Sequence, residues 1–314
     1  MKPVVTILES IHPDGLEKLA EFADVRMGLG ASRSEQLNLV TEANAIIIKS
    51  LVQVDQGFFK HAKNLLAIGR AGIGVDNIDL EEAYRRKIKI LTVPTGSSVT
   101  AAEFAIMHIL FLCRRMTEVI MAISLGDFRR HLLEGRELRN MVVGLVGLGN
   151  VGLRVAERLQ PFGCRLFGFD PGDIDINRFE ACGGIRLDSF DQMLPKLDLI
   201  SFHARLNAKN YHMMGKPEFS KVKKGLMLVN VARAGLIDDL ALLEALEKGI
   251  VSDVALDVLQ PEPPFDKPPG TFSYKHPLLD HPKVFVTPHI GASTVDAQSH
   301  IACDIVDQLR SVLL

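Results

Sequence analysis

The stretch Met141–Asp170, MVVGLVGLGNVGLRVAERLQPFGCRLFGFD, decides the fold. An apolar run leads into the pattern Gly-x-Gly-x-x-Gly at Gly147, Gly149 and Gly152. An amphipathic segment and a second apolar run follow, and the second run ends at Asp170. A glycine pattern alone is weak evidence, because glycine-rich turns are common. Between a strand and a helix, and with an acid about 20 residues later, it predicts a dinucleotide-binding βαβ unit.

Each part of this unit has a physical task. Gly147 permits the tight turn, Gly149 lets the backbone approach a pyrophosphate, and Gly152 lets helix and strand pack closely. The N–H groups of Asn150 and Val151 lie at the helix start, where the helix dipole also favours a phosphate. A turn that binds nothing is the weaker interpretation.

Asp170 indicates which dinucleotide is bound. Its carboxylate can accept hydrogen bonds from the adenosine ribose hydroxyls, and it would repel a 2′-phosphate. We therefore expect NAD rather than NADP as the cofactor. FAD is a weaker alternative, because no second flavin-type motif is visible.

Apolar runs alternate with helical patterns on both sides of this unit. Strands are expected at Val4–Leu8, Val25–Met27, Ala45–Ile48, Leu65–Ile68, Ile88–Val93, Val142–Val146, Leu166–Phe169, Leu199–Phe202, Leu226–Val229, Val254–Leu256 and Val284–Thr287. Helices are expected at Pro13–Phe22, Ser34–Ala43, Asp55–Ala62 and Leu80–Arg86. This alternation predicts the α/β class with two doubly wound parallel sheets.

Turn-rich crossings at 92–97 and 287–291 divide the chain. We expect a flavodoxin-like substrate-binding domain formed by residues 1–95 plus 291–314. A Rossmann NAD-binding domain, residues 96–290, would be inserted between these two pieces. Thr294–Leu314 is predicted to be a terminal helix that packs back on the first domain.

The segment Ser97–Leu125 resembles a membrane span at first sight. It contains Glu103, His108 and Arg114, which a span would not carry without a special reason. It is predicted instead to be one long buried or interface helix. A capping box at Thr100 and Glu103 would start this helix, and Gly126 would end it.

Composition excludes several classes of partner. The chain has 314 residues, 24% of them charged, and a net charge of −2, which does not favour nucleic acid binding. The four cysteines lie far apart without a CxxC pair, so we expect reduced thiols and no metal site. The start of the chain lacks a hydrophobic signal-peptide core, which favours the cytoplasm.

Charged residues follow several predicted strand ends. These are Arg233 within Asn230–Gly235, Glu262 between two prolines, and His289 within Pro288–Gly291. Alone, Arg233 is more readily explained as a surface residue and Glu262 as part of a turn, while His289 is evenly balanced between structure and catalysis. Together, however, they occur in one order with the glycine fingerprint and two further motifs, Gly69–Asp79 and Ala255–Val258.

This ordered set resembles the D-isomer-specific 2-hydroxyacid dehydrogenases over nearly the whole chain, most closely their phosphoglycerate dehydrogenase branch. The resemblance implies an NAD-dependent enzyme that interconverts a D-2-hydroxyacid and its 2-oxoacid. His289 would be the general acid/base, oriented by Glu262. Arg233 would bind the substrate carboxylate and the reacting oxygen. Asp257 would hold the nicotinamide carboxamide.

The resemblance also implies further contacts. The active site would lie in a cleft between the domains, and closure of the cleft would exclude water. A homodimer would form through residues 97–140. The remaining implied cofactor contacts are His203, Val231, Ala232, Arg233, His289 and Gly291, and the implied substrate contacts are Lys49, Arg70, Ala71, Gly72, Ile73, Gly74, Arg233 and His289.

The chain departs from the family pattern at certain positions. Lys49 stands where phosphoglycerate enzymes often carry Arg, so the charge is kept but bidentate recognition is lost. An exposed lysine is an equally good interpretation, and Arg70 offers a second cation. Arg205 replaces the usual Pro, either altering a cofactor contact or pointing into solvent. Judged alone, His203 and His212 are expected to be near-surface histidines with satisfied ring nitrogens.

Two features leave the function open in detail. The long segment Pro263–Pro282, which includes Phe265, Phe272 and Tyr274, either covers the active-site mouth or, slightly favoured, is a surface excursion. The chain ends after one terminal helix, so feedback control through an attached serine-binding domain is not expected.

The first substrate expected is 3-phosphoglycerate with 3-phosphohydroxypyruvate, as in serine biosynthesis. Glyoxylate or hydroxypyruvate is the alternative within the enzyme class. A protein that senses NAD in the manner of a transcriptional corepressor, without catalysis, is the alternative from another class.

Overall fold

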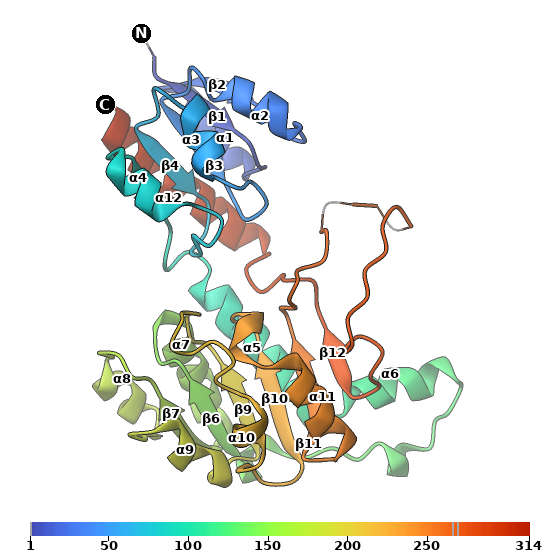
Figure 1. Ribbon diagram of the computed structural model, residues 1–314. Coiled ribbons are helices and arrows are strands. Elements are labelled where there is room, and N and C mark those ends of the chain that lie inside the picture. Colours follow the sequence, from blue (N-terminus) through green and yellow to red (C-terminus); the bar gives the residue numbers. More distant parts are fainter. Residues whose placement is uncertain (1, 266, 269) are drawn as a thin grey trace. The chain divides into compact units, whose positions relative to one another are not determined.

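The computed structural model describes residues 2–265, 267–268 and 270–314. They form two compact units (Figure 1). Unit 1 contains the residues through Ser98 together with Ala292–Leu314, and unit 2 is Val99–Gly291. Each unit is built on one parallel sheet, so the predicted α/β class with two parallel sheets is confirmed.

Unit 1 has a five-stranded parallel sheet in the order β2-β1-β3-β4-β5. This is the flavodoxin-like order, as predicted. β3 reads Ala-Ile-Ile-Ile and is buried throughout, because apolar side chains cover both faces of the sheet. The elements are β1 (Val4–Ile7), α1 (Pro13–Ala20), β2 (Asp24–Met27), α2 (Arg33–Leu39), β3 (Ala45–Ile48), α3 (Gln56–His61), β4 (Ala67–Arg70), α4 (Leu80–Arg85) and β5 (Lys89–Leu91).

The terminal helix α12 (Val295–Leu313), which was predicted at Thr294–Leu314, completes unit 1, and the Thr294 side chain caps its start. α12 packs closely on α1, since a Cβ placed on Gly15 would lie 2.6 Å from the Cβ of Ala302. Lys18 of α1 also forms an ion pair with Asp307 of α12, with 2.5 Å between Nζ and Oδ2. The segment that forms unit 2 is therefore inserted between two pieces of unit 1.

Unit 2 has a seven-stranded parallel sheet in the order β12-β11-β10-β9-β6-β7-β8. Its central order is that of the Rossmann fold: strands are added on one side of β6 as far as β8 and then, from β9 onward, on the other side. The strands are β6 (Val142–Val146), β7 (Arg165–Phe169), β8 (Gly184–Arg186), β9 (Leu199–Phe202), β10 (Leu226–Asn230), β11 (Val251–Leu256) and β12 (Val284–Val286). The helices that follow them include α7 (Asn150–Leu159), α8 (Ile176–Ala181), α9 (Phe190–Met193), α10 (Lys216–Phe219) and α11 (Asp239–Glu247).

β8 was not predicted, because only its first residue is buried and no apolar run marks it.

The prediction of one long helix over Ser97–Leu125 is wrong. The segment forms α5 (Ser98–Cys113) and α6 (Met116–Ser124). The helix is interrupted between them, where Arg115 adopts a left-handed conformation with φ of 52°. The proposed capping box is also wrong, because α5 begins at Ser98 and Thr100 lies inside it. Gly126, with φ of +71°, does follow the end of α6.

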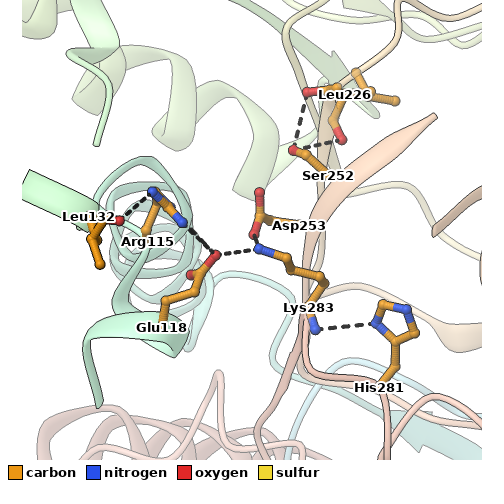
Figure 2. A network of polar contacts seen from close by, with 9 residues as sticks. Arg115, Glu118, Leu132, Leu226, Ser252, Asp253, His281 and Lys283 are labelled. Carbon is orange, nitrogen blue, oxygen red and sulfur yellow. Dashed lines mark hydrogen bonds and ion pairs between the residues drawn. The ribbon is translucent and has the colours of Figure 1, made fainter. Parts of the chain in front are cut away.

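Polar contacts explain the break and hold α6 against the sheet (Figure 2). The Arg115 guanidinium donates to the carbonyl of Leu132 at 3.0 Å and lies 3.4 Å from the Glu118 carboxylate. Glu118 also pairs with Lys283, which lies 3.9 Å from Asp253 of β11. These charges anchor the amphipathic helix without burying any of its residues completely. Among the described helices, none is long and apolar enough to cross a membrane.

Candidate functional site

The glycine-rich loop after β6 is shaped by backbone contacts. Gly147 has φ of +92°, and a Cβ there would lie 2.5 Å from the backbone nitrogen of Ala204. A Cβ on Gly152 would lie 2.0 Å from the carbonyl oxygen of Gly147. A Cβ on Gly149 would meet nothing within 4 Å. The fold itself therefore requires Gly147 and Gly152, whereas Gly149 leaves open space beside the start of α7.

Asp170 follows β7 and reaches back to the same loop. Its Oδ2 accepts a hydrogen bond from the Leu148 N–H at 2.8 Å, and its Oδ1 accepts one from Gly172 at 2.8 Å. The carboxylate is thus held beside the glycine turn. The open space at Gly149, the helix start at Asn150 and the acid at Asp170 together fit a dinucleotide.

His203, directly after β9, lies against the same turn, because a Cβ on Gly152 would be 3.7 Å from the Cβ of His203. The expectation of a satisfied near-surface histidine is wrong for this residue. Part of the residue is accessible, but both ring nitrogens are buried, and neither has a hydrogen-bond partner among the described residues. A buried polar ring without partners at this position fits a ligand that would supply them.

Burial lowers the pKa of His203 to about 3 from an ordinary value of 6.5. Above about pH 6.5 the ring is neutral in both folded and unfolded chains. Between those values only the unfolded chain binds the proton, so the free energy of unfolding falls by up to about 1.4 kcal/mol per pH unit as pH decreases.

We therefore expect the thermal midpoint of the cofactor-free wild type to fall more between pH 7.5 and pH 5 than that of His203→Leu. Circular dichroism melts at both pH values would measure this difference. His300→Leu, at an exposed position on α12, is the matched control and should behave as the wild type. If the thermal midpoints of the wild type and His203→Leu fell equally between the two pH values, the lowered pKa of His203 would be contradicted.

Two other residues that follow β9 lie at the surface. Arg205 is exposed, which agrees with the solvent interpretation of this replacement. His212 is exposed, and its Nδ1 lies 3.8 Å from Oδ2 of Asp238.

His289 and Glu262 are brought together although 27 positions separate them in sequence. His289 Nδ1 lies 2.6 Å from Oε1 of Glu262. His289 has φ of 54°, an unusual conformation for a residue with a side chain, so the surrounding loop must hold it. The carboxylate fixes one ring nitrogen and leaves the other available for proton transfer.

Asp257 organises the loop that carries His289. Its side chain is almost fully buried at the end of β11. Its Oδ1 accepts hydrogen bonds from the Thr287 hydroxyl at 2.6 Å and the Ile290 N–H at 2.9 Å, and its Oδ2 accepts one from Gly291 at 2.8 Å. The loop on both sides of His289 is therefore tied to one carboxylate.

His108 of α5 supports this arrangement through Thr287. It is fully buried; its Nδ1 lies 2.8 Å from the Phe104 carbonyl, and its Nε2 lies 3.3 Å from the Thr287 hydroxyl. Burial lowers the pKa of His108, although the hydrogen bond to the Phe104 carbonyl and, to a smaller extent, the Asp257 carboxylate oppose the shift. Neither His108 nor Thr287 was predicted as a site residue, because their proximity depends on the packing of α5 against the end of β12.

Arg233 lies in the turn after β10, and Asn230 shapes that turn. Asn230 is nearly fully buried; its side-chain oxygen accepts from the Ala232 N–H at 3.0 Å, and its side-chain nitrogen donates to the Arg233 carbonyl at 2.9 Å. The Arg233 guanidinium donates to the Ala232 carbonyl at 2.7 Å. Val231, Ala232 and Arg233 are all partly accessible. Sequence reasoning missed the role of Asn230, which its position at a strand end could have suggested.

The segment Pro263–Pro282 connects Glu262 to the strand before His289. Asp266 and Pro269, which belong to this predicted segment, lie outside the described residues. The Phe265 ring lies edge-on to His289, with 6.3 Å between centroids. At least this part of the segment is therefore next to the His289–Glu262 pair.

Unit 1 contains its own cluster of predicted substrate contacts, at the carboxyl ends of β3 and β4. Lys49 is partly buried, and its Nζ donates to Oε1 of Gln298 at 2.7 Å, so the exposed-lysine interpretation is wrong. Burial lowers the pKa of Lys49; the Glu9 carboxylate opposes this shift and the Arg70 guanidinium adds to it. Two cationic side chains thus lie close together on adjacent strands.

The loop 71–74 beside this cluster offers fewer donors than expected. The N–H of Ala71 donates to the Ile48 carbonyl at 2.8 Å, and that of Gly72 donates to the Arg70 carbonyl at 2.7 Å. A Cβ on Gly72, where φ is +148°, would collide with the Arg70 guanidinium. In the described part of the chain, Ile73 and Gly74 have no backbone partner for their N–H groups, so they are the remaining candidates.

The donor set does not suggest a metal ion. Among the described residues, no group of three or more His, Cys, Asp or Glu side chains is arranged to hold one.

Known proteins are similar to the chain over its length. Residues 106–291 match the family described as D-isomer specific 2-hydroxyacid dehydrogenase, NAD binding domain. The D-3-phosphoglycerate dehydrogenase of Methanocaldococcus jannaschii is 33% identical over 309 residues, which is 98% of this chain. The chain spans only 57% of the length of that relative.

Solved structures share the architecture. A protein of Thermus thermophilus superimposes with a TM-score of 0.85 at 30% identity, covering 98% of this chain and 96% of the other. A glyoxylate reductase of Paecilomyes thermophila superimposes with a TM-score of 0.87 at 27% identity, covering 99% and 95%. These two similarities extend over both units.

Proposed function

Because the chain belongs to the D-isomer specific 2-hydroxyacid dehydrogenase family, we propose that it is an NAD-dependent dehydrogenase of D-2-hydroxyacids. The observation that carries this proposal is the 2.6 Å contact between His289 Nδ1 and Glu262 Oε1, on a loop held by the buried Asp257. An imidazole with a carboxylate on one nitrogen is suited to general acid/base catalysis near neutral pH.

In this proposal, different residues of unit 2 bind the cofactor, transfer the proton and bind the substrate. Bound NAD would supply a hydride acceptor through its nicotinamide ring. Asn150, Val151 and Asp170 would hold its pyrophosphate and ribose, and Asp257 its carboxamide. His289 Nε2 would take the hydroxyl proton of the substrate, because Glu262 occupies Nδ1 and stabilises the protonated ring. Arg233 would bind the substrate carboxylate with its planar guanidinium.

Within this class we propose 3-phosphohydroxypyruvate and 3-phosphoglycerate as the substrate pair. The support comes from unit 1, where Lys49 and Arg70 place two positive charges at adjacent strand ends. A phosphate would gain from both, whereas glyoxylate has no distal group to bind them.

A substrate panel tests both levels of the proposal. NADH oxidation would be followed with 3-phosphohydroxypyruvate, hydroxypyruvate and glyoxylate. Far better turnover of glyoxylate would contradict the phosphate assignment. Tight NADH binding without turnover of any oxoacid would contradict the enzyme assignment and favour an NAD-sensing protein.

Replacing Lys49 by methionine should separate the substrates. We expect kcat/KM for 3-phosphohydroxypyruvate to fall by about 10- to 150-fold, the usual range for losing one hydrogen bond to a charged group. The value for glyoxylate should change little. Lys63→Met, at an exposed lysine in the same unit, is the matched control. An equal loss for both substrates would count against a distal phosphate contact.

We further propose a homodimer through residues 97–140. α6 and the segment after it expose apolar side chains that water disfavours, including Ile120, Met121, Ile123, Leu125 and Phe128. Sedimentation velocity should show a species of twice the chain mass, and a monomer at micromolar concentration would contradict the proposal.

A further inference from the structure

The segment Pro263–Pro282 has no task in the proposed reaction, yet buried contacts fix its second half. His276 is only 5% exposed. Its Nδ1 accepts a hydrogen bond from the Leu278 N–H at 3.3 Å, so Nε2 carries the ring hydrogen and donates to Oδ2 of Asp239 at 3.1 Å. Asp239 is the first residue of α11. His276 therefore ties the segment to the start of that helix with both ring nitrogens satisfied.

Tyr274 extends this attachment toward Glu262. Its ring stacks on His276, with 6.3 Å between centroids and 17° between planes. Its hydroxyl donates to the Pro261 carbonyl at 2.7 Å, and Pro261 directly precedes Glu262. Burial raises the pKa of Tyr274, and the carboxylates of Asp239 and Glu262 raise it further. The hydroxyl therefore keeps its proton and remains a donor.

The His289–Glu262 pair needs such external support. The side chains of Glu262 and His289 are 43% and 33% exposed, so water competes for both partners. An accessible ion pair or hydrogen bond gains little free energy and must also order a flexible carboxylate. The contact will be well populated only if the backbone that carries Glu262 is itself held in place.

We propose that Tyr274 and His276 are positioning residues that clamp the backbone before Glu262 and thereby hold its carboxylate against His289. The clamp consists of the Asp239–His276 contact, the Tyr274–His276 stack and the Tyr274–Pro261 hydrogen bond. The inference rests on the proposed function only where it concerns turnover; the geometric consequence for His289 holds independently.

Tyr274→Phe is the sharpest test, because it removes one oxygen and leaves the stack in place. In the chain labelled with 15N-histidine, the Nδ1–H resonance of His289 is assigned by its absence in His289→Gln. We expect this resonance to broaden and exchange faster with water in Tyr274→Phe. kcat with the best substrate of the panel should fall about two- to tenfold, as for loss of one net hydrogen bond, while the Kd for NADH is unchanged.

Combining Tyr274→Phe with Glu262→Gln distinguishes a role of Tyr274 in positioning Glu262 from a general effect on the structure. In a Glu262→Gln background, Tyr274→Phe should cause no further loss of kcat, because both changes act through the same side chain. His276→Gln, which keeps a donor for Asp239, should retain more activity than His276→Leu. Tyr84→Phe is the control, since Tyr84 is 86% exposed in unit 1.

Three results would overturn the inference. They are an unchanged His289 resonance in Tyr274→Phe, an additive loss of kcat in the Glu262→Gln background, and equal losses in the two His276 variants. If no oxoacid is turned over, the proposed function fails, but the resonance and its exchange rate still decide the clamp. Because Tyr274→Phe removes only one oxygen, we expect this variant to fold. The His289 Nδ1–H resonance of the wild type is the reference for its line width and exchange rate.

Discussion

His289→Gln is expected to lower kcat for reduction of a 2-oxoacid by about 10²- to 10⁴-fold, the usual contribution of a general acid or base. Glutamine keeps a polar side chain that can contact Glu262, but it cannot exchange a proton near neutral pH. The 2.6 Å contact to Glu262 shows that the imidazole is already oriented by a carboxylate. The loss should therefore appear in kcat, with a much smaller change in the Kd for NADH.

Stopped-flow measurement of NADH oxidation at saturating oxoacid would isolate this step, and NADH emission would report cofactor binding directly. His300→Gln, an exposed histidine on α12, should leave kcat unchanged. Glu262→Gln should cause a smaller loss than His289→Gln, because it disturbs orientation and charge without removing the proton carrier. Full turnover in His289→Gln would remove this residue from the chemistry.

Gly149→Ala and Gly152→Ala should both weaken NADH binding, but only Gly152→Ala should also lower the free energy of unfolding, although the two glycines lie in the same loop. At Gly152 the new methyl group meets the Gly147 carbonyl at 2.0 Å, so the backbone must move. We expect a destabilisation of about 1–3 kcal/mol, typical of overpacking, together with loss of NADH binding.

At Gly149 the methyl group enters open space, and the φ of −80° suits alanine. The entropic gain from replacing glycine and the poorer helix cap should nearly cancel, so the free energy of unfolding should change by less than about 1 kcal/mol. The methyl group would nevertheless fill the space proposed for the pyrophosphate. We expect NADH affinity to fall by about 5- to 150-fold, which corresponds to a steric cost of about 1–3 kcal/mol.

Thermal melts without cofactor and titrations with NADH would measure the two effects on both variants. Gly183→Ala is unsuitable as a control because its φ is +76°, whereas Gly57→Ala tests an unrelated glycine in unit 1. Unchanged NADH affinity in Gly149→Ala would show that the pyrophosphate does not approach this loop. A stable, NADH-binding Gly152→Ala would show that the turn is more adaptable than its contacts indicate.

Much of the fold could be predicted because the relevant information is local. The buried strands of a doubly wound sheet are short apolar runs, and the runs at Ala45–Ile48 and Val142–Val146 coincide with β3 and β6. β8 escaped prediction because it lies at the sheet edge and buries one residue. The break at Arg115 also escaped, because the contacts that stabilise it come from Leu132 and Glu118 rather than from a helix-breaking residue.

The sequence alone determined the glycine loop, the acid at Asp170 and the order of Arg233, Glu262 and His289, because each is a motif attached to a strand end. Only the tertiary structure decided how these groups are supported. Asp257 ties down the His289 loop, and His203 has buried ring nitrogens without partners among the described residues. Tyr274 holds the backbone before Glu262. Such contacts join residues far apart in the chain, and their distances are set by how helices and loops pack on the sheet, which no local pattern records.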